Sequence, residues 1–238
     1  MALNATFMIH GKIMDTKAFY NRYPYPDVKD SYREGVLSRK SLSAPQNFEG
    51  NILVVGCGTA EALMIAHKNP DANVLGIDIS ETSLSIAQGL IEKYQIKNLF
   101  LENKDITEYS APDQFDFVVA SCVLHHIPNV DAAIRNIYAS VKENGMIAGS
   151  VYSDQRPNYI RQITDKKFET VEALREYLEK NPNEWYIRHE KNDSELADTW
   201  MNPYFLLYNK ISLLQLLIRF NTITIRDATD RFYFSAIK

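Results

Sequence analysis

Short apolar runs alternate with longer amphipathic stretches over residues 51–151, a pattern that predicts a parallel sheet covered by helices. The run ILVV at 52–55 is β-branched and ends at Gly56, as expected of a buried strand followed by a turn. The segment 83–94 instead repeats its apolar residues at helical spacing. Regular strand–helix alternation implies right-handed crossovers and helices on both faces of the sheet. The expected strands are 52–55, 73–80, 98–103, 115–121 and 146–151, and the expected helices are 61–68, 83–94 and 131–144.

The two flanks do not share this alternation. Residues 1–50 show no clear strand pattern and contain the run YNRYPYPD. Residues 152–210 separate the fifth predicted strand from two late runs that alternate like an antiparallel pair of strands. We expect helices at 170–180 and 211–220 and strands at 222–228 and 231–237.

The composition excludes several classes of protein. Hydrophobic residues make up 45% and charged residues 24%, which are ordinary globular values. A formal charge of −4 gives no basic excess for a nucleic-acid backbone, and two cysteines are too few for a disulfide framework. The N-terminus lacks a secretory pattern, and no apolar run approaches the roughly 20 residues that span a bilayer. We therefore expect a cytoplasmic protein that acts on neither nucleic acid nor membranes.

A glycine pair marks the end of the first predicted strand. Gly56 and Gly58 would allow a tight turn and close approach of a ligand, although a simple strand-to-helix turn also explains them. Asp78 follows Gly58 by 20 residues, at the end of the second predicted strand. A carboxylate there can accept both ribose hydroxyls of a nucleoside, or it can serve as an ordinary helix cap beside Ser80. Glu61 stands where a dinucleotide fingerprint has a third glycine, which disfavours a pyrophosphate.

Five motifs in order carry a family resemblance. ILVVGCGTAEA, VLGIDIS, NKDITEY, FDFVVASCVLHHI and VKENGMI resemble the motifs of class I S-adenosylmethionine (SAM) dependent methyltransferases. The flanking YNRYPYP, GSVYSDQR and LADTWMNPYFLLY look like a branch with a Tyr/Pro-rich N-terminal segment that is sometimes fused to tetratricopeptide repeats.

The resemblance implies an α/β fold with a Rossmann-like, doubly wound sheet of seven strands and an antiparallel last strand. Together with the aromatic flanks, it leads us to expect an N-terminal helical and aromatic lid segment at 1–50 and a methyltransferase domain at 51–238, with a substrate cap inserted after strand five at 152–210. SAM would be the cofactor and S-adenosylhomocysteine the product.

The resemblance also assigns the cofactor-binding residues. Gly56, Cys57 and Gly58 would lie against the methionine part of SAM, and Asp78 would bind the ribose. Ile79 would flank the adenine, while Asp105 and the backbone of Ile106 would reach its amino group. Ser121 and Cys122 would border the methionine and the methyl group.

Two positions depart from the family pattern. Val54 stands where an acid is usual, so another group must hold the methionine ammonium or the affinity for SAM falls. Ala60 replaces a frequent third glycine, which is a mild change. Cys57 is better explained as a small apolar residue packed at the glycine turn than as a reactive thiol.

The histidine pair after the fourth predicted strand supplies the catalytic candidates. His125 or His126 could take a proton from an oxygen or nitrogen nucleophile. The family often carries such a pair without using it as a base, so a structural role stays open. Adjacent histidines without acids or cysteines at ligand spacing are a poor metal site, and we expect no metal.

The flanks hold 17 of the 27 aromatic side chains, seven in residues 1–50 and ten in residues 152–210. Ring faces attract a sulfonium cation, so Tyr20 and Tyr23 are candidates at the cofactor, unless they merely pack the segment onto the sheet. The charged run 188–198 is expected to be solvated surface, and Trp185 belongs to the expected acceptor-binding cap. The substrate candidates are Tyr25, Tyr152, Arg156, Trp200 and Tyr204, with a surface ion pair the alternative for Arg156.

Three functions are compatible with these features. The first is methyl transfer from SAM to an oxygen or nitrogen acceptor on a small molecule or a protein side chain. The second, motivated by Val54, is a methyltransferase-fold protein that binds SAM or its product without turnover. A nicotinamide oxidoreductase is the third, and Glu61 disfavours it.

Overall fold

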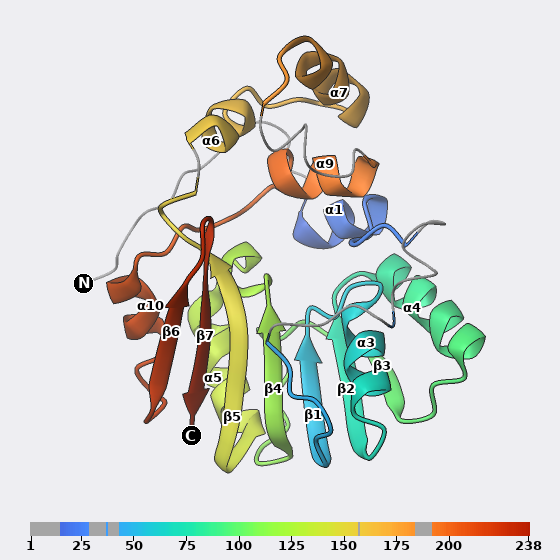
Figure 1. Cartoon of the computed structure of the whole chain (residues 1–238), viewed down its shortest axis with the longest axis vertical. Coiled ribbons are helices and arrows are strands. Elements are labelled where there is room, and N and C mark those ends of the chain that lie inside the picture. Colours follow the sequence, from blue (N-terminus) through green and yellow to red (C-terminus); the bar gives the residue numbers. More distant parts are fainter. Residues whose placement is uncertain (1–14, 29–36, 38–42, 157, 184–191) are drawn as a thin grey trace.

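A seven-stranded sheet forms the centre of the protein, with strand order β3-β2-β1-β4-β5-β7-β6 (Figure 1). The computed structural model describes residues 15–28, 37, 43–156, 158–183 and 192–238. Strands β1 to β5 run parallel, while β7 pairs antiparallel with both β5 and β6. The strands are β1 Gly50–Val55, β2 Ala72–Asp78, β3 Leu99–Asn103, β4 Phe115–Ser121, β5 Val141–Tyr152, β6 Ile223–Asp227 and β7 Arg231–Ile237. The predicted doubly wound sheet with an antiparallel last strand is confirmed.

Nine helical segments are assigned in the part of the chain that the structure describes. Ser80, Asn129 and Thr170 accept hydrogen bonds from backbone N–H groups in the first turns of α4, α5 and α7, which fixes where these helices begin. The segments are α1 Thr16–Arg22, α3 Glu61–Lys68, α4 Glu81–Tyr94, η2 Leu124–His126, α5 Val130–Ser140, α6 Asn158–Thr164, α7 Val171–Lys180, α9 Asp193–Trp200 and α10 Lys210–Leu216. None of them is long and apolar enough to cross a bilayer.

Two predicted helix ends are wrong, and one of them is that of the expected helix 211–220, which ends at Leu216. The expected helix 131–144 ends at Ser140, and Val141 begins β5 opposite Phe115 of β4. The N–H groups of Asp113 and Gln114 donate to the last helical carbonyls, those of Ala139 and Ser140, at 2.9 and 3.1 Å. The fully buried Val141 side chain then joins the core beside the sheet. Tertiary packing therefore overrides the helical periodicity of this segment.

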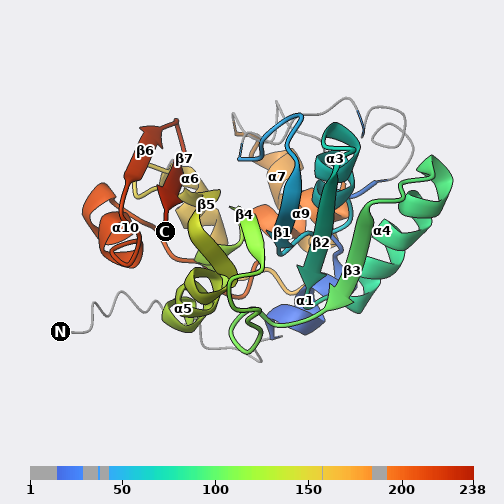
Figure 2. The same cartoon turned by 90° about the horizontal axis from the view of Figure 1, so that it is seen from below.

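The sheet is buried on both faces, as its continuous apolar strands predict. Alternate residues of β1 point to opposite sides: Ile52 and Val54 pack with α3 and α4, whereas Leu53 and Val55 pack with α5 and α10. Figure 2 shows α4 beside β3 at one edge of the sheet and α10 beside β6 at the other. Two separate hydrophobic cores thus hold the strand ends in place.

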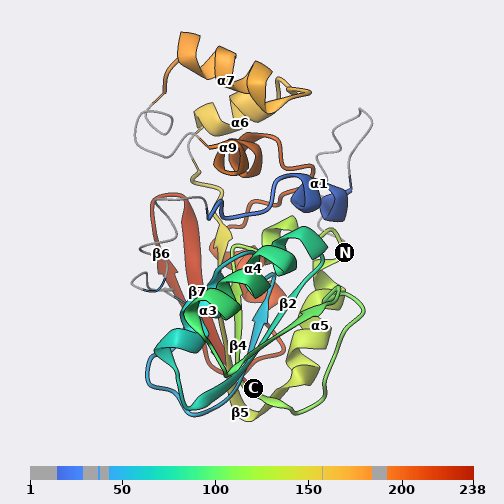
Figure 3. The same cartoon turned by 90° about the vertical axis from the view of Figure 1, so that its right-hand side faces the viewer.

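A third layer of helices lies over the carboxyl ends of the strands. It contains α1, α6, α7 and α9. Figure 3 shows these helices beyond the carboxyl ends of the strands, with the body of the sheet on the opposite side of those ends. This layer has an apolar core of its own, built around Phe19, Leu174, Leu196 and Trp200. The N-terminal segment and the region after β5 are therefore packed together, although they are far apart in the sequence.

Candidate active site

A pocket of about 840 Å³ lies between the carboxyl ends of the parallel strands and the helical layer above them. Its floor comes from the ends of β1, β2, β4 and β5, and its roof from α1 and α9 (Figure 1). Ligands of open α/β sheets bind at this end of the strands. We describe the pocket in two parts: a donor half around β1, β2 and β3, and an acceptor half around β4, β5 and α9.

The glycine turn after β1 requires glycine at two positions. Gly56 and Gly58 have φ values of +62° and +55°, where side chains are strained. A β-carbon on Gly58 would collide with the carbonyl oxygen of Tyr25, and one on Gly56 would collide with Val123. The same Tyr25 carbonyl accepts a hydrogen bond from the Thr59 N–H at 3.0 Å. The N-terminal segment is thereby seated directly on the glycine turn.

The Asp78 carboxylate is oriented by the backbone. One oxygen accepts from the Gly58 N–H at 2.9 Å and the other from the Ser80 N–H at 2.8 Å. Burial raises the pKa of Asp78, while these hydrogen bonds act in the opposite direction. A carboxylate has about four acceptor positions, so these bonds leave acceptor capacity for ligand hydroxyl groups. Asp78, the predicted ribose-binding residue, therefore lines the pocket with acceptor positions available to a ligand.

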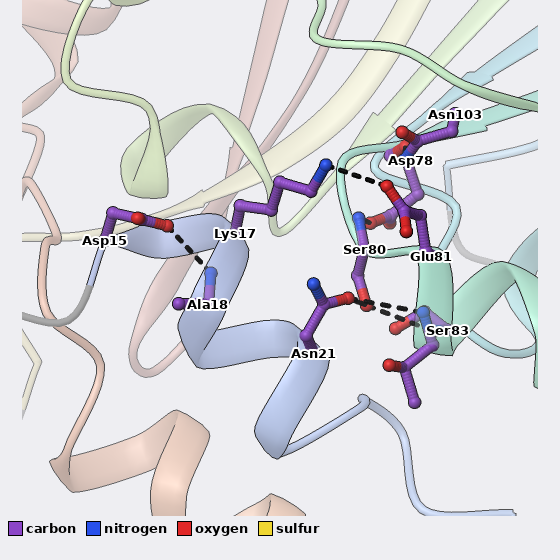
Figure 4. A network of polar contacts seen from close by, with 10 residues as sticks. Asp15, Lys17, Ala18, Asn21, Asp78, Ser80, Glu81, Ser83 and Asn103 are labelled. Carbon is purple, nitrogen blue, oxygen red and sulfur yellow. Dashed lines mark hydrogen bonds and ion pairs between the residues drawn. The ribbon is translucent and has the colours of Figure 1, made fainter.

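Helix α1 closes over the donor half through polar contacts to the start of α4 (Figure 4). The Ser80 hydroxyl lies 3.0 Å from Oδ1 of Asn21, and that same oxygen accepts from the Thr82 N–H at 3.2 Å. Lys17 forms an ion pair with Glu81 at 2.9 Å. Helix α1, the roof over Asp78, is therefore attached to the start of α4, the helix that follows Asp78 in the chain.

The remaining predicted donor residues also line this pocket. Oδ1 of Asp105 accepts from the N–H and the hydroxyl of Thr107, both at 2.8 Å, which fixes its carboxylate at the pocket wall. The structure places at the pocket the predicted residues Gly56, Cys57, Gly58, Asp78, Ile79, Asp105, Ile106, Ser121, Cys122 and Tyr20. Sequence reasoning did not select Asn103, whose side chain donates to the Asp78 carbonyl at 2.9 Å.

Cys122 marks the boundary between the two halves. Its φ is +53°, a strained conformation for a residue with a side chain. The sulfur lies 3.2 Å from the Ser150 hydroxyl and accepts a hydrogen bond from Arg231 at 3.3 Å. Burial raises the pKa of the Cys122 thiol, and Arg231 opposes this effect. The thiol is therefore held as a fixed part of the pocket wall.

The two predicted catalytic histidines occupy different positions. His126 lines the pocket, and its Nδ1 lies 2.8 Å from the Tyr204 carbonyl. Because a carbonyl only accepts, we assign the proton to Nδ1, which leaves a lone pair on Nε2. Burial lowers the pKa of His126, so the ring is neutral at pH 7. This is the protonation state that a general base needs.

His125 does not border the pocket. It is fully buried, and its ring packs against Tyr152 with centroids 3.8 Å apart. Its Nδ1 accepts from the Tyr152 N–H at 3.4 Å. Burial, together with the nearby His126 and two arginines, lowers the pKa of His125 well below the usual range. Its position favours a supporting role beneath Tyr152.

Tyrosines and a carboxylate form the roof of the acceptor half. The Tyr20 hydroxyl donates to Asp198 of α9 at 2.9 Å and accepts from Asn202 at 2.8 Å. Burial and the Asp198 charge raise the pKa of Tyr20 well above its usual value, so the hydroxyl stays protonated. Tyr25 and Tyr152 also line this half. The contact between Tyr20 and Asp198 joins α1 to α9 across the pocket.

Several predictions for the flanks differ from the structure. Tyr23 and Trp200 belong to the apolar core of the helical layer and do not line the pocket. Tyr204 contributes its backbone carbonyl to His126, and Trp185 lies outside the described residues. The charged run 188–198 is not simply solvated surface. Its described part belongs to α9, which buries Leu196 and Ala197, and Asp198 faces the pocket.

Charged residues that sequence reasoning missed complete the pocket wall. Asn192 caps α9 through the Glu195 N–H at 2.8 Å, and Leu196, Ala197 and Trp200 form the buried side of that helix. This helical spacing is the signal that could have placed Asp198 near a core. The charged lining residues missed from the sequence are Asp15, Lys17, Lys104, Glu195, Asp198, Asp230 and Arg231. Among the described residues, no group of three acids, histidines or cysteines is arranged to hold a metal ion.

Comparison with known proteins places this geometry in a family. The model of a methyltransferase domain family matches residues 48–202. A demethylmenaquinone methyltransferase of Listeria welshimeri is 31% identical over 101 residues, covering 41% of this chain and 43% of its own. An uncharacterized protein of Synechococcus is 24% identical over 235 residues, covering 82% of this chain and 55% of its own. The chain thus spans about half the length of these curated relatives.

Solved structures share the fold. A Haemonchus contortus phosphoethanolamine N-methyltransferase 2, solved with phosphomonomethylethanolamine and S-adenosylhomocysteine, has a TM-score of 0.55 at 17% identity. The similarity covers 96% of this chain and 61% of that one. A SAM-dependent methyltransferase of Aquifex aeolicus gives a TM-score of 0.54 at 13% identity, covering 94% of this chain and 98% of its own. At these identities the likeness concerns the fold alone.

Proposed function

The chain belongs to the methyltransferase domain family, and from this premise we propose that it transfers a methyl group from SAM to an oxygen or nitrogen acceptor on a small molecule or a protein side chain. One observation carries the proposal: a single pocket joins a half suited to a nucleoside with a half that contains a neutral histidine and tyrosine rings. Methyl transfer needs these two parts side by side, because the acceptor attacks the methyl carbon in line with the departing sulfur.

In the donor half we assign the ribose hydroxyls to Asp78. Its carboxylate is held by two backbone N–H groups and retains free acceptor positions toward the pocket. Asp105, Ile106 and Ile79 would surround the adenine. The turn at 56–58, together with Ser121 and Cys122, would contact the methionine part and the sulfonium.

Glu61 is the best substitute for the acid that Val54 replaces. The Val54 side chain is fully buried against the α3 and α4 layer and does not line the pocket. Glu61 does line the pocket and begins α3, directly after the glycine turn. We therefore assign the methionine ammonium to Glu61. The absence of an acid at position 54 is then compatible with SAM binding.

In the acceptor half His126 would act as the general base. The Tyr204 carbonyl fixes its tautomer, so the lone pair of Nε2 can take the proton of an attacking hydroxyl or amine. The rings of Tyr20, Tyr25 and Tyr152 would exclude water and stabilise the sulfonium. In this proposal residues 1–50 act as a lid and residues 152–210 as the acceptor-binding cap of the 51–238 domain.

The donor assignment is tested by calorimetric titration with S-adenosylhomocysteine. Asp78→Ala should weaken binding at least about tenfold, the loss expected when hydrogen bonds to a charged group are removed. Asp71→Ala is the matched control, because this exposed residue immediately precedes the opposite end of β2. Unchanged affinity in Asp78→Ala would contradict the role of that residue, and absence of binding to the unmodified protein would contradict the proposed cofactor.

Binding without turnover is the competing function, favoured by the replacement of the usual acid with Val54. It is separated from catalysis by incubating the protein with SAM labelled on its methyl group and a broad acceptor panel. Transfer of label that is lost in His126→Ala supports catalysis with His126 as base. Transfer that persists in this variant supports catalysis but removes the assignment of the base.

A further inference from the structure

The cationic side chains of the pocket differ in whether they have a carboxylate partner. Four cationic side chains line the pocket, and three of them have a carboxylate partner: Lys17 with Glu81 at 2.9 Å, Lys104 with Glu102 at 4.0 Å, and Arg231 with Asp230. The fourth is Arg156. Among the residues that the structure describes, no carboxylate lies within ion-pair distance of it, and its Nε is buried without a hydrogen-bond partner.

The nearby carboxylate is already occupied. Asp230 receives two parallel hydrogen bonds from Arg231, at 2.9 and 3.0 Å, one to each oxygen of its carboxylate. Both Arg231 and Arg156 lower the pKa of Asp230, so both positive charges lie close to this single negative one. Two guanidinium groups therefore lie beside Asp230 at the ends of β5 and β7, while Asp198, another carboxylate of this half, accepts a hydrogen bond from the Tyr20 hydroxyl.

Arg156 is held in place before any ligand arrives. It ends a turn after β5, in which its N–H donates to the Ser153 carbonyl at 3.1 Å. Ser153 is fully buried, and its N–H donates to the carbonyl of Asp230, the residue before β7, at 3.0 Å. The guanidinium lies over the Tyr152 ring, 3.6 Å from its centroid. A guanidinium fixed in this way loses little freedom when it binds a planar anion.

We propose that Arg156 binds an anionic group, a carboxylate or a phosphate, on the methyl acceptor. The Tyr152 ring that carries Arg156 also contacts His126 edge to face, with centroids 5.5 Å apart. An acceptor anchored through its anion at Arg156 would therefore extend across Tyr152 and present its nucleophile to His126. This inference rests on the proposed methyl transfer for the order of these groups, but the anion site itself is independent of turnover.

The test uses benzoate and phenyl phosphate as probes, with benzyl alcohol as the uncharged control of similar shape. Each is titrated calorimetrically into the protein with and without saturating S-adenosylhomocysteine. We expect both anions to bind at least about tenfold more tightly than benzyl alcohol, the discrimination typical of charge-assisted hydrogen bonds. The stronger of the two probes then identifies the acceptor anion as a carboxylate or a phosphate.

The variants separate this site from the donor site. Arg156→Gln should weaken the anions at least about tenfold and Arg156→Lys less, because lysine keeps the charge but loses the planar fork. Lys210→Gln, which removes an exposed cation paired with Asp227 outside the pocket, should leave anion affinity unchanged. The affinity for S-adenosylhomocysteine should be preserved in all three variants.

Two results would overturn the inference. The first is an anion affinity that does not depend on Arg156. The second is an Arg156 variant that loses affinity for S-adenosylhomocysteine but not for the anions, which would place the methionine carboxylate at Arg156. If the unmodified protein fails to bind S-adenosylhomocysteine, the proposed function fails while the anion titrations still decide the site. Arg156-dependent binding of benzoate or phenyl phosphate alone then supports the inference, and its absence overturns it.

Discussion

The two halves of the pocket are built by different means. In the donor half, short sequence segments at the ends of adjacent strands supply the residues, and backbone N–H groups orient the key carboxylate of Asp78. In the acceptor half, Tyr20 and Asp198 come from distant segments and are joined by a side-chain hydrogen bond, and Tyr152 from a third segment lines the same half. The donor half thus depends on main-chain geometry, and the acceptor half depends on pairs of side chains and their protonation.

This difference indicates how each half can be disturbed separately. Adding a β-carbon to the glycine turn should damage the donor half, whereas removing one side chain above it should not. Removing a charge or a hydrogen-bond partner should affect the acceptor half and the packing of the helical layer. The following predictions use this separation, from the largest expected effect to the smallest.

Gly58→Ala should give the largest loss. The new methyl group would meet the Tyr25 carbonyl at a backbone conformation of φ +55°, and the Gly58 N–H would move away from Asp78. Affinity for S-adenosylhomocysteine should fall about a hundredfold or more, equivalent to about 3 kcal/mol. Calorimetric titration measures this loss directly.

Gly89→Ala is the matched control for that substitution. Gly89 lies in α4, and a β-carbon there would meet no atom within 4 Å. The change should leave donor affinity unaltered and stabilise the protein by about 0.5–1 kcal/mol through helix propensity. Normal donor binding by Gly58→Ala would show that the turn does not shape the donor half.

Asp198→Ala should weaken the connection between α1 and α9. The buried Tyr20 hydroxyl would lose its charged acceptor, which is expected to lower the free energy of unfolding by about 1.5–3 kcal/mol. Urea denaturation measures this change, and Tyr20→Phe with the double variant gives the coupling energy. Additive effects of the two single variants would contradict a direct link.

The same Asp198→Ala variant also separates the halves. Its affinity for S-adenosylhomocysteine should remain close to that of the unmodified protein, since the Asp78 carboxylate and its backbone donors are unaffected. A large loss of donor affinity would show that the two halves are not independent.

Acidification should destabilise the protein by a smaller amount. Burial lowers the pKa of His125 and His126 below the value near 6.5 that we expect in the unfolded chain. The unfolded state then binds more protons below that value, so the stabilisation is complete above about pH 7 and is lost as the pH falls toward the folded pKa values. Each pKa unit of difference corresponds to about 1.4 kcal/mol at most.

Urea denaturation between pH 7.5 and 5.5 measures this loss of unfolding free energy. The pH range is chosen because it brackets the unperturbed histidine pKa. His125→Phe keeps a ring against Tyr152 but cannot take up a proton, so the dependence of stability on pH should flatten. His67→Phe, at an exposed position of α3, should leave the dependence as it is. An unchanged dependence in His125→Phe would contradict a neutral, buried His125.

The sheet and much of the donor half could be predicted from the sequence because their signals are local. The apolar runs bound the central strands closely, and the spacing of Gly58 and Asp78 reports a contact that the structure shows at 2.9 Å. The boundary at Ser140 could not be read in this way. The strand conformation of Val141 is determined by its pairing with β4, which is a long-range contact.

The acceptor half was only partly predictable, for the same physical reason. Tyr20, Tyr25, Tyr152 and Arg156 were selected for their chemistry, yet nothing local indicated that Asp198 would meet Tyr20. A charged run resembles solvated surface in the sequence when the helix within it has few apolar residues on the side that faces the core. The aromatic character of Trp200 predicts a substrate residue, whereas packing places it in the core of the helical layer.

A crystal structure of the protein with S-adenosylhomocysteine tests the central claim most directly. We predict that the ribose hydroxyls contact the Asp78 carboxylate, that the adenine lies by Asp105, and that the sulfur points past Cys122 toward His126. A ligand whose sulfur faces away from His126 and Tyr152, or whose ribose avoids Asp78, would contradict the division of this pocket into a donor and an acceptor half.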